Sequence, residues 1–155
     1  MCPNAVFILT SNVGADQIGH YGYLGSGDID EEFKSRVMYP LLKSAFKRNE
    51  FLGRINEIVY FLPFSVEQCV EFVEQELSAV RVKAEKLGIY FKWEEAAARK
   101  LADSFDNHYG ARSLKNEVGR KVLNRIADLN MSEKITKGSK VNLKCGENGL
   151  EIDIS

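Results

Sequence analysis

The feature that most limits what this chain can fold into is a long helical pattern between Ser65 and Gly88. Its apolar residues recur at alternating spacings of four and three: Val66, Val70, Val73, Leu77, Val80, Ala84 and Leu87. Ser65 and Gln68 stand at the spacing of a capping box, and Gly88 is the type of residue that ends a helix. Further apolar residues widen the stripe, which favours a helix packed against a core over a coiled coil.

The residues after Gly88 predict the remainder of a small α+β domain. Their apolar patterns indicate a strand, two helices and a hairpin, at residues 89–93, 94–105, about 113–131 and 140–152. We expect turns at Asp106–Gly110 and at Gly146–Gly149. With the helix after Ser65, these elements form a domain that we assign to residues 65–155.

Two continuous apolar runs, Ala5–Thr10 and Ile58–Leu62, are typical of strands buried in a parallel sheet. Asn12 follows the first run, at the end of a strand where α/β proteins place groups that contact ligands. It could orient a water or a phosphate, or simply belong to a turn. Arg54 precedes the second run among apolar neighbours, which suits an arginine that reaches a fixed phosphate, although an ordinary surface arginine fits as well.

Between these runs we expect a loop and a helix. Residues 14–30 are rich in Gly, Tyr and Asp without a period, so we predict a mobile loop. Tyr21 and Tyr23 in that loop could contact a partner or face solvent. Residues 30–48 have the spacing of a helix, which Pro40 should kink or split.

A further candidate for chemistry is the sequence HYGAR, which ends at Arg112. Gly110 permits a sharp entry into the following helix. An arginine at the start of a helix opposes the positive end of the helix dipole unless an anion joins it. Arg112 is therefore either part of a phosphate site or one of the cations of a solvated basic surface.

Composition argues against several other kinds of site. The net charge is −1, and the cysteines, Cys2, Cys69 and Cys145, are odd in number and far apart. With only two histidines, a metal site is not expected. No apolar run approaches the length of a membrane span, and Ala5–Thr10 is too short for a signal peptide. Residues 110–144 hold nine Lys or Arg and three acidic residues, which leaves a nucleic-acid-binding module as an alternative, although the aromatic residues of single-strand binders are missing there.

Three stretches, in this order, resemble the C-terminal half of the ATPase module of Clp-type AAA+ proteins. TSNVGAD resembles the sensor-1 strand end, usually TSN-x-G, and FLGRINEIVYF resembles the arginine-finger segment, usually F-x-NRIDE. HYGARSLK resembles the sensor-2 segment, usually YGARPLKR. The resemblance covers nearly the whole chain and is greatest to the ClpB disaggregase group, in particular to its animal mitochondrial members.

The resemblance implies a fold in two parts. Residues 1–64 would be the C-terminal remnant of an α/β large subdomain, and residues 65–155 a complete α+β small subdomain, the C-terminal lid. In the small subdomain, Arg112 would contact the nucleotide of its own subunit, with Gly110 and Ala111 beside it.

The same resemblance gives roles to two residues of the first part. Asn12 would position the attacking water near the γ-phosphate, and Arg54 would reach the nucleotide of the neighbouring subunit in a ring. The chain departs from the usual motifs at four positions: Gly53, Asn56, Ser113 and Asn116. None of them removes an arginine that could reach a phosphate, but the loss of charge at Asn56 puts any salt bridge there in doubt.

The motifs that bind phosphate and magnesium do not occur in the sequence. There is no G-x-x-x-x-G-K-[ST] loop, and no apolar run ends in an acidic pair. In the family these elements precede the part that this chain resembles. We therefore expect a fragment that hydrolyses no ATP alone, with ATP and Mg²⁺ held mainly by other parts of the parent. The expected partners are other subunits of the ring and unfolded or aggregated proteins, in mitochondria or otherwise in the cytoplasm.

A second alternative is a Clp-type unfoldase that feeds a peptidase. Those proteins carry an Ile-Gly-Phe or Ile-Gly-Leu loop between sensor 1 and the arginine finger. The nearest match here is Ile18-Gly19-His20, which lies too close to the first strand and ends in the wrong residue. The disaggregase interpretation is therefore favoured.

Overall fold

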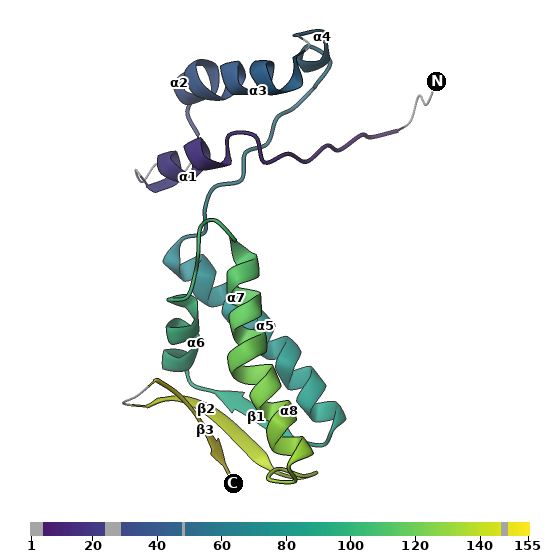
Figure 1. Cartoon of the computed structure of the whole chain (residues 1–155), viewed down its shortest axis with the longest axis vertical. Helices are drawn as coiled ribbons and strands as arrows, with labels where there is room; N and C mark the ends of the chain where they lie inside the picture. The colour runs from purple at the N-terminus through teal and green to yellow at the C-terminus, as the bar shows by residue number, and fades with distance from the viewer. Residues whose placement is uncertain (1–4, 24–28, 48, 147–148) are drawn as a thin grey trace. The chain divides into compact units, whose positions relative to one another are not determined.

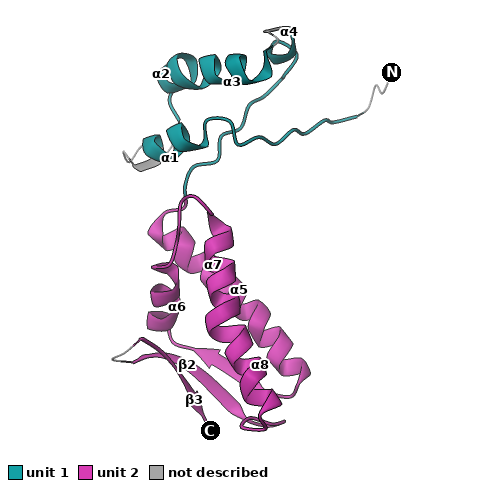
Figure 2. Ribbon diagram, viewed as in Figure 1, with its two compact units in different colours: residues 1–63 teal, residues 64–155 magenta. Residues whose placement is uncertain are grey.

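The computed structural model describes residues 5–23, 29–47, 49–146 and 149–155. Cys2, Arg48 and the centre of the turn predicted at Gly146–Gly149 lie outside the described residues. The chain divides into two compact units, residues 1–63 and 64–155 (Figure 2). Each unit is described by itself.

Unit 2 is built around helix α5, Val66–Lys86, and the predicted capping box is present. The Ser65 hydroxyl accepts from the backbone N–H of Gln68 at 3.2 Å, and the Gln68 side chain accepts from the backbone N–H of Ser65 at 2.9 Å. Leu87 is the C-cap, and Gly88 follows with φ +75°, the left-handed conformation that ends many helices. The middle of the predicted stripe is buried, whereas Val66 and Leu87 at its ends are 68% and 52% exposed.

The rest of unit 2 is a three-stranded sheet with helices on one face (Figure 1). Its elements are β1 (Tyr90–Trp93), α6 (Glu95–Ala102), α7 (Ala111–Val118), the π-helical turn η2 (Gly119–Leu123), α8 (Asn124–Met131), β2 (Lys140–Gly146) and β3 (Gly149–Ile154). β1 pairs parallel with β2, and β2 pairs antiparallel with β3. This is the predicted order of elements, with the third helix starting two residues earlier and containing a π turn.

One face of the sheet and the inner faces of the helices form a single core. Phe91, Val141 and Leu143 of the strands are at most 1% exposed, and they belong to one cluster with Leu77 of α5 and Leu114 of α7. On the opposite face of β1, Tyr90 is 61% exposed. Unit 2 is thus a small helical domain on a three-stranded sheet.

Unit 1 is helical throughout its ordered secondary structure. Its elements are α1 (Ala15–Tyr23), α2 (Glu31–Phe33), the π-helical turn η1 (Lys34–Met38), α3 (Tyr39–Phe46) and α4 (Asn49–Leu52). The helix predicted in residues 30–48 is present and is not split: α2, η1 and α3 follow one another without a gap, and Pro40 is the second residue of α3. The π turn precedes it, and the Tyr39 N–H donates to the Lys34 carbonyl, a wider spacing that accommodates the proline without an N–H.

The prediction of a loop at residues 14–30 is wrong over α1. Gly14 has φ +78°, and the N–H groups of Ala15 and Ile18 donate to the carbonyls of Asn12 and Gly14, which starts the helix. Tyr21 packs on Phe33 with ring centroids 4.3 Å apart, and its hydroxyl donates to Asp30 Oδ2 at 2.8 Å. Tyr21 is therefore engaged inside unit 1.

The two strands predicted for unit 1 do not form among the described residues. Residues 5–10 and 57–62 have no strand assignment, and the exposed fractions of Val6, Phe7, Ile8 and Leu9 lie between 70% and 88%. Phe61 in the second run is 85% exposed. The sheet of an α/β subdomain is therefore absent from the described part of unit 1. A strand needs a hydrogen-bonded neighbour, and the sequence pattern reports only how apolar the segment is.

Candidate functional site

A short loop in unit 2, Asp106–Gly110, leads into helix α7. The Gly110 N–H donates to the Asp106 carbonyl at 2.7 Å and closes the loop. Gly110 has φ +57° and ψ −146°, a conformation that residues other than glycine rarely adopt. A Cβ at Gly110 would meet no atom within 4 Å, so the backbone conformation, rather than space, calls for glycine.

Two side chains hold this loop together. Asp106 Oδ1 accepts from the N–H groups of His108 and Tyr109 at 2.8 and 3.4 Å. Ser113 Oγ donates to the Gly110 carbonyl at 2.7 Å and accepts from the Asp106 N–H at 3.0 Å. Ser113 thus ties the beginning of the loop to its end. Sequence reasoning noted Ser113 only as a departure from a motif, and no local pattern could have revealed the bond to Asp106.

Arg112 is the second residue of α7 and its side chain is exposed. Within the described residues it forms no ion pair, and no side chain caps the N-terminus of α7. The guanidinium is thus carried by the first turn of α7, whose partial charge is positive, and no described carboxylate lies within ion-pair distance of it. Gly110, Ala111 and Arg112, which the sequence predicts as one site, form one continuous stretch at this helix start.

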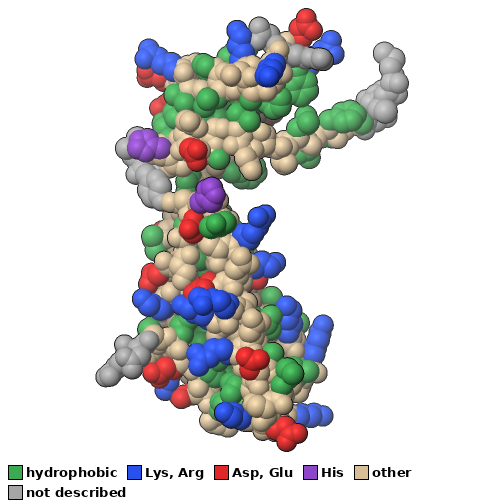
Figure 3. Space-filling model, viewed as in Figure 1, with side chains coloured by type: hydrophobic (Ala, Val, Ile, Leu, Met, Phe, Trp, Pro, Cys, Tyr) green, Lys and Arg blue, Asp and Glu red, His purple; other side chains and the backbone are tan. Residues whose placement is uncertain are grey.

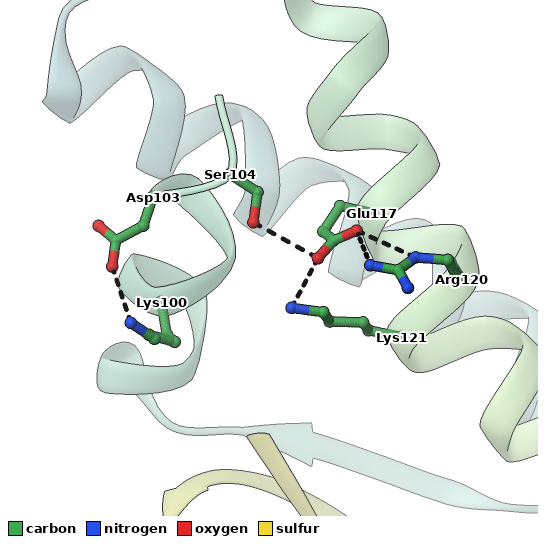
Figure 4. A network of polar contacts seen from close by, with 6 residues as sticks. All are labelled: Lys100, Asp103, Ser104, Glu117, Arg120 and Lys121. Atoms are coloured by element: carbon green, nitrogen blue, oxygen red, sulfur yellow. Dashed lines mark hydrogen bonds and ion pairs between the residues drawn. The ribbon is translucent and has the colours of Figure 1, made fainter. Parts of the chain in front are cut away.

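The largely buried carboxylate of Glu117 links α7 to the turn after α6 (Figure 4). The Glu117 side chain is 13% exposed and accepts from Lys121 Nζ at 2.6 Å, Arg120 Nη2 at 2.8 Å and Ser104 Oγ at 3.4 Å. Burial alone raises the pKa of Glu117, but the bonds from Lys121 and Arg120 outweigh it, so the pKa lies below its ordinary value. The spacing along the helix could have indicated the two cations, but not Ser104, which follows α6.

Arg54 lies in unit 1, just after α4. Its N–H donates to the Phe51 carbonyl at 3.1 Å, and its exposed side chain lines an open hollow of about 340 Å³ with Phe46, Glu50 and Phe51. The expectation of an arginine fixed beside a buried strand is wrong in this structure, because no strand follows it. The ring centroids of Phe46 and Phe51 lie 5.2 Å apart, which makes one side of the hollow apolar.

Asn12 lies at the start of α1, and its side chain is exposed. Its backbone carbonyl accepts from Ala15 N–H at 3.1 Å. The side chain thus remains available for a ligand, while the main chain forms the turn that the sequence also allowed. Asn12 lies before α1 and Arg54 after α4, both in unit 1, and Arg112 lies in α7 of unit 2.

The basic residues of unit 2 are interspersed with acidic ones (Figure 3). Lys115 lies 3.9 Å from Glu76, Lys144 pairs with Asp153 at 2.6 Å, and Glu117 holds two further cations. This distribution differs from a continuous basic stripe, which is the surface that nucleic-acid phosphates require.

The part of the chain that the structure describes offers no support for a metal site or a membrane-spanning helix. No group of three His, Cys, Asp or Glu residues there could hold a metal ion. Of the helices described, none combines the length and apolar character needed to cross a membrane.

Comparison with known proteins gives one family. A family model of the C-terminal, D2-small domain of ClpB protein matches residues 64–143, which include the loop and helix start at Arg112. The mitochondrial disaggregase of Homo sapiens is 40% identical over 151 residues, covering 81% of this chain and 21% of that protein. The protein of the same name from Bos taurus is 39% identical over 151 residues, covering 81% of this chain and 22% of that protein.

Bacterial proteins are also similar. The chaperone protein ClpB of Chlamydia muridarum is 31% identical over 143 residues, covering 92% of this chain and 16% of that protein. A match that covers 92% of this chain extends beyond unit 2 into unit 1. The chain spans about a fifth or less of the length of these relatives.

Proposed function

The chain belongs to the ClpB family, and from this membership we propose that it is the C-terminal part of an ATPase module in a protein disaggregase. Unit 2 is the small C-terminal domain of that family. Unit 1 is then the end of the large subdomain that precedes it. The match of bacterial ClpB to 92% of the chain supports this role for unit 1, because the small domain alone is shorter.

The observation that carries the proposal is the helix start at Gly110–Arg112, inside the segment that matches the family. An exposed arginine without a counter-ion, beside the free N–H groups of a helix, binds a phosphate well. Arg112 contacts the phosphates of the nucleotide in its own subunit. Gly110 and Ala111 allow the backbone to approach them closely.

Arg54 and Asn12 act on the same reaction from unit 1. The exposed guanidinium of Arg54 reaches the nucleotide of the neighbouring subunit, where it stabilises the charge that develops on the transferred phosphoryl group. The exposed amide of Asn12 orients the attacking water. Asn12 precedes α1 and Arg54 follows α4, and neither side chain forms an ion pair or hydrogen bond among the described residues.

ATP supplies the phosphoryl group that is transferred, and Mg²⁺ is held by carboxylates that we assign to other parts of the protein. Further proposals follow from the relatives. The full-length protein assembles as a ring, acts on unfolded or aggregated proteins, and resides in mitochondria, as the names of the mammalian relatives suggest.

The test compares two arginine variants of the full-length protein. Arg54→Ala should abolish hydrolysis and leave nucleotide binding intact, because a finger acts on the transition state and such arginines contribute roughly 10³ to 10⁵ in rate. Arg112→Ala should also weaken nucleotide affinity, because its contact is made with bound nucleotide. Lys115→Ala, which removes another exposed cation of α7, is the matched control. Near-normal turnover and affinity in both arginine variants would refute the two roles.

A further inference from the structure

Two side chains, those of Asp106 and Ser113, hold the backbone of the loop before α7 by hydrogen bonds. Asp106 and Ser113 together make four hydrogen bonds to backbone groups between residues 106 and 110. The Asp106 carboxylate binds the N–H groups of His108 and Tyr109, and the Ser113 hydroxyl binds the Asp106 N–H and the Gly110 carbonyl. The backbone is therefore restrained at both ends of the segment from Asp106 to Ser113. Arg112 lies within this closed segment, one residue before Ser113.

The serine is also the position at which this chain differs from the motif it resembles. Proline, usual at this place, would fix the backbone by its ring and would have no hydroxyl to hold the loop. In this chain Ser113 holds the helix start by bonding to Gly110 at 2.7 Å and to Asp106 at 3.0 Å. The restraint comes from hydrogen bonds, so a single hydroxyl group can be removed to test it.

We propose that Ser113 and Asp106 are positioning residues that preset Arg112 for nucleotide. They keep the loop closed before nucleotide arrives, so that binding does not have to order residues 106–113. Ordering a backbone segment costs conformational entropy, and a loop that is already ordered avoids part of this cost when nucleotide binds. The inference rests on the proposed role of Arg112. It adds that two residues that do not contact the nucleotide, Asp106 and Ser113, contribute to nucleotide affinity.

The test measures the dissociation constant for ADP and the turnover number in the full-length protein. Ser113→Ala should raise the dissociation constant about two- to tenfold, the net contribution of one or two hydrogen bonds, and change turnover at saturating ATP little. Ser113→Thr keeps the hydroxyl and should restore affinity. Asp106→Ala should weaken binding similarly, whereas Asp106→Asn keeps the Oδ1 acceptor and should not.

A double-mutant cycle with Arg112→Ala decides whether the serine acts through the arginine. In the Arg112→Ala background, Ser113→Ala should have no further effect on ADP affinity. Ser132→Ala is the matched control, because the Ser132 hydroxyl, just after α8, donates to the Asp128 and Leu129 carbonyls within α8, at the other end of the helical run. It should leave affinity unchanged.

The possible failures are distinguishable. An unchanged affinity in Ser113→Ala, or an equal loss with and without Arg112, would overturn the positioning role while the role of Arg112 stands. The same loss in Ser113→Thr as in Ser113→Ala would also overturn it. An unchanged affinity in Arg112→Ala would refute the proposed function itself and the inference with it.

Discussion

Single side chains in this protein differ in how firmly the structure holds them. Asn12, Arg54 and Arg112 are all exposed and lack ion pairs among the described residues, as expected of groups whose ligand is another molecule. The residues around Arg112 are, by contrast, bonded at several points: Asp106, Ser113 and Glu117. Substitution of Arg112 tests the free side chain, and substitution of Asp106, Ser113 or Glu117 tests the bonds that hold its surroundings.

Glu117 should make the stability of unit 2 depend on pH. Its pKa is lowered in the folded protein, so the carboxylate stabilises the fold above its ordinary pKa of 4.5. This contribution is lost as the pH falls through the lower, folded value. We expect Glu117→Gln to reduce the free energy of unfolding at pH 7 by about 1 kcal/mol, because the partner side chains of Arg120 and Lys121 are 70% and 40% exposed and solvent screens the pairs.

Urea unfolding at pH 7 and at acidic pH checks this expectation. The difference between wild type and Glu117→Gln should shrink in acid, where both side chains are uncharged. Glu95→Gln is the matched control, since Glu95 makes the exposed i,i+4 pair with Arg99 and should contribute little. A difference that stays the same at both pH values would contradict the role of the charge.

Elements differ in how far the sequence can predict them. Helix α5 was predictable to within a residue or two, because its cap, its apolar stripe and its terminal glycine are all local signals. The π turns η1 and η2 carry no sequence period, and α1 was missed because Gly19 and Gly22 interrupt its pattern. The bonds of Ser113 to Asp106 and of Ser104 to Glu117 join residues 7 and 13 positions apart, separations that match no helix or turn period, and could not be predicted.

The two apolar runs of unit 1 show a different limit of sequence reasoning. Their composition predicts strands, yet residues 5–10 and 57–62 form no sheet among the described residues. A strand of a parallel sheet depends on neighbours that composition does not reveal. The candidate site residues next to these runs, Asn12 and Arg54, were therefore identified by resemblance to motifs and not by predicted geometry.

Hydrogen exchange on the 155-residue chain should separate the elements. Amides in the middle of α5 and of the helical run from α7 to α8 should exchange slowly, because these helices enclose the core of unit 2. Amides of residues 5–10 and 57–62 should exchange quickly, or become protected only at high protein concentration if the strands pair between chains. Strong protection of residues 5–10 that is independent of protein concentration would contradict the finding that this run forms no sheet within the chain.

The two units differ in how much apolar surface they bury. The buried residues of unit 2 form one cluster that includes both sheet and helices. Among the described residues of unit 1, the buried apolar side chains are Ile29, Met38, Leu42 and Leu52, whereas each of its two apolar runs has exposed residues: Val6, Phe7, Ile8, Leu9, Val59 and Phe61. These exposed runs are consistent with the proposal that unit 1 completes a larger subdomain in the full-length protein.

In the proposed function, Arg54 and Arg112 serve one nucleotide site from two adjacent subunits. A site in an Arg54→Ala subunit retains its own Arg112 and can receive Arg54 from an Arg112→Ala neighbour. Mixed rings of the two variants should therefore contain sites with both arginines, although neither pure ring does. A mixture of Arg54→Ala with the double variant Arg54→Ala/Arg112→Ala has no such site and serves as the control.

The deciding measurement is ATP hydrolysis by equal mixtures of the Arg54→Ala and Arg112→Ala full-length proteins. The ATP concentration should be low enough to leave the pure Arg112→Ala ring largely empty. If the two arginines act from adjacent subunits, the mixture hydrolyses ATP faster than either variant alone and faster than the control mixture. A mixture no faster than the mean of the two pure variants would contradict the claim that the two arginines act from different subunits.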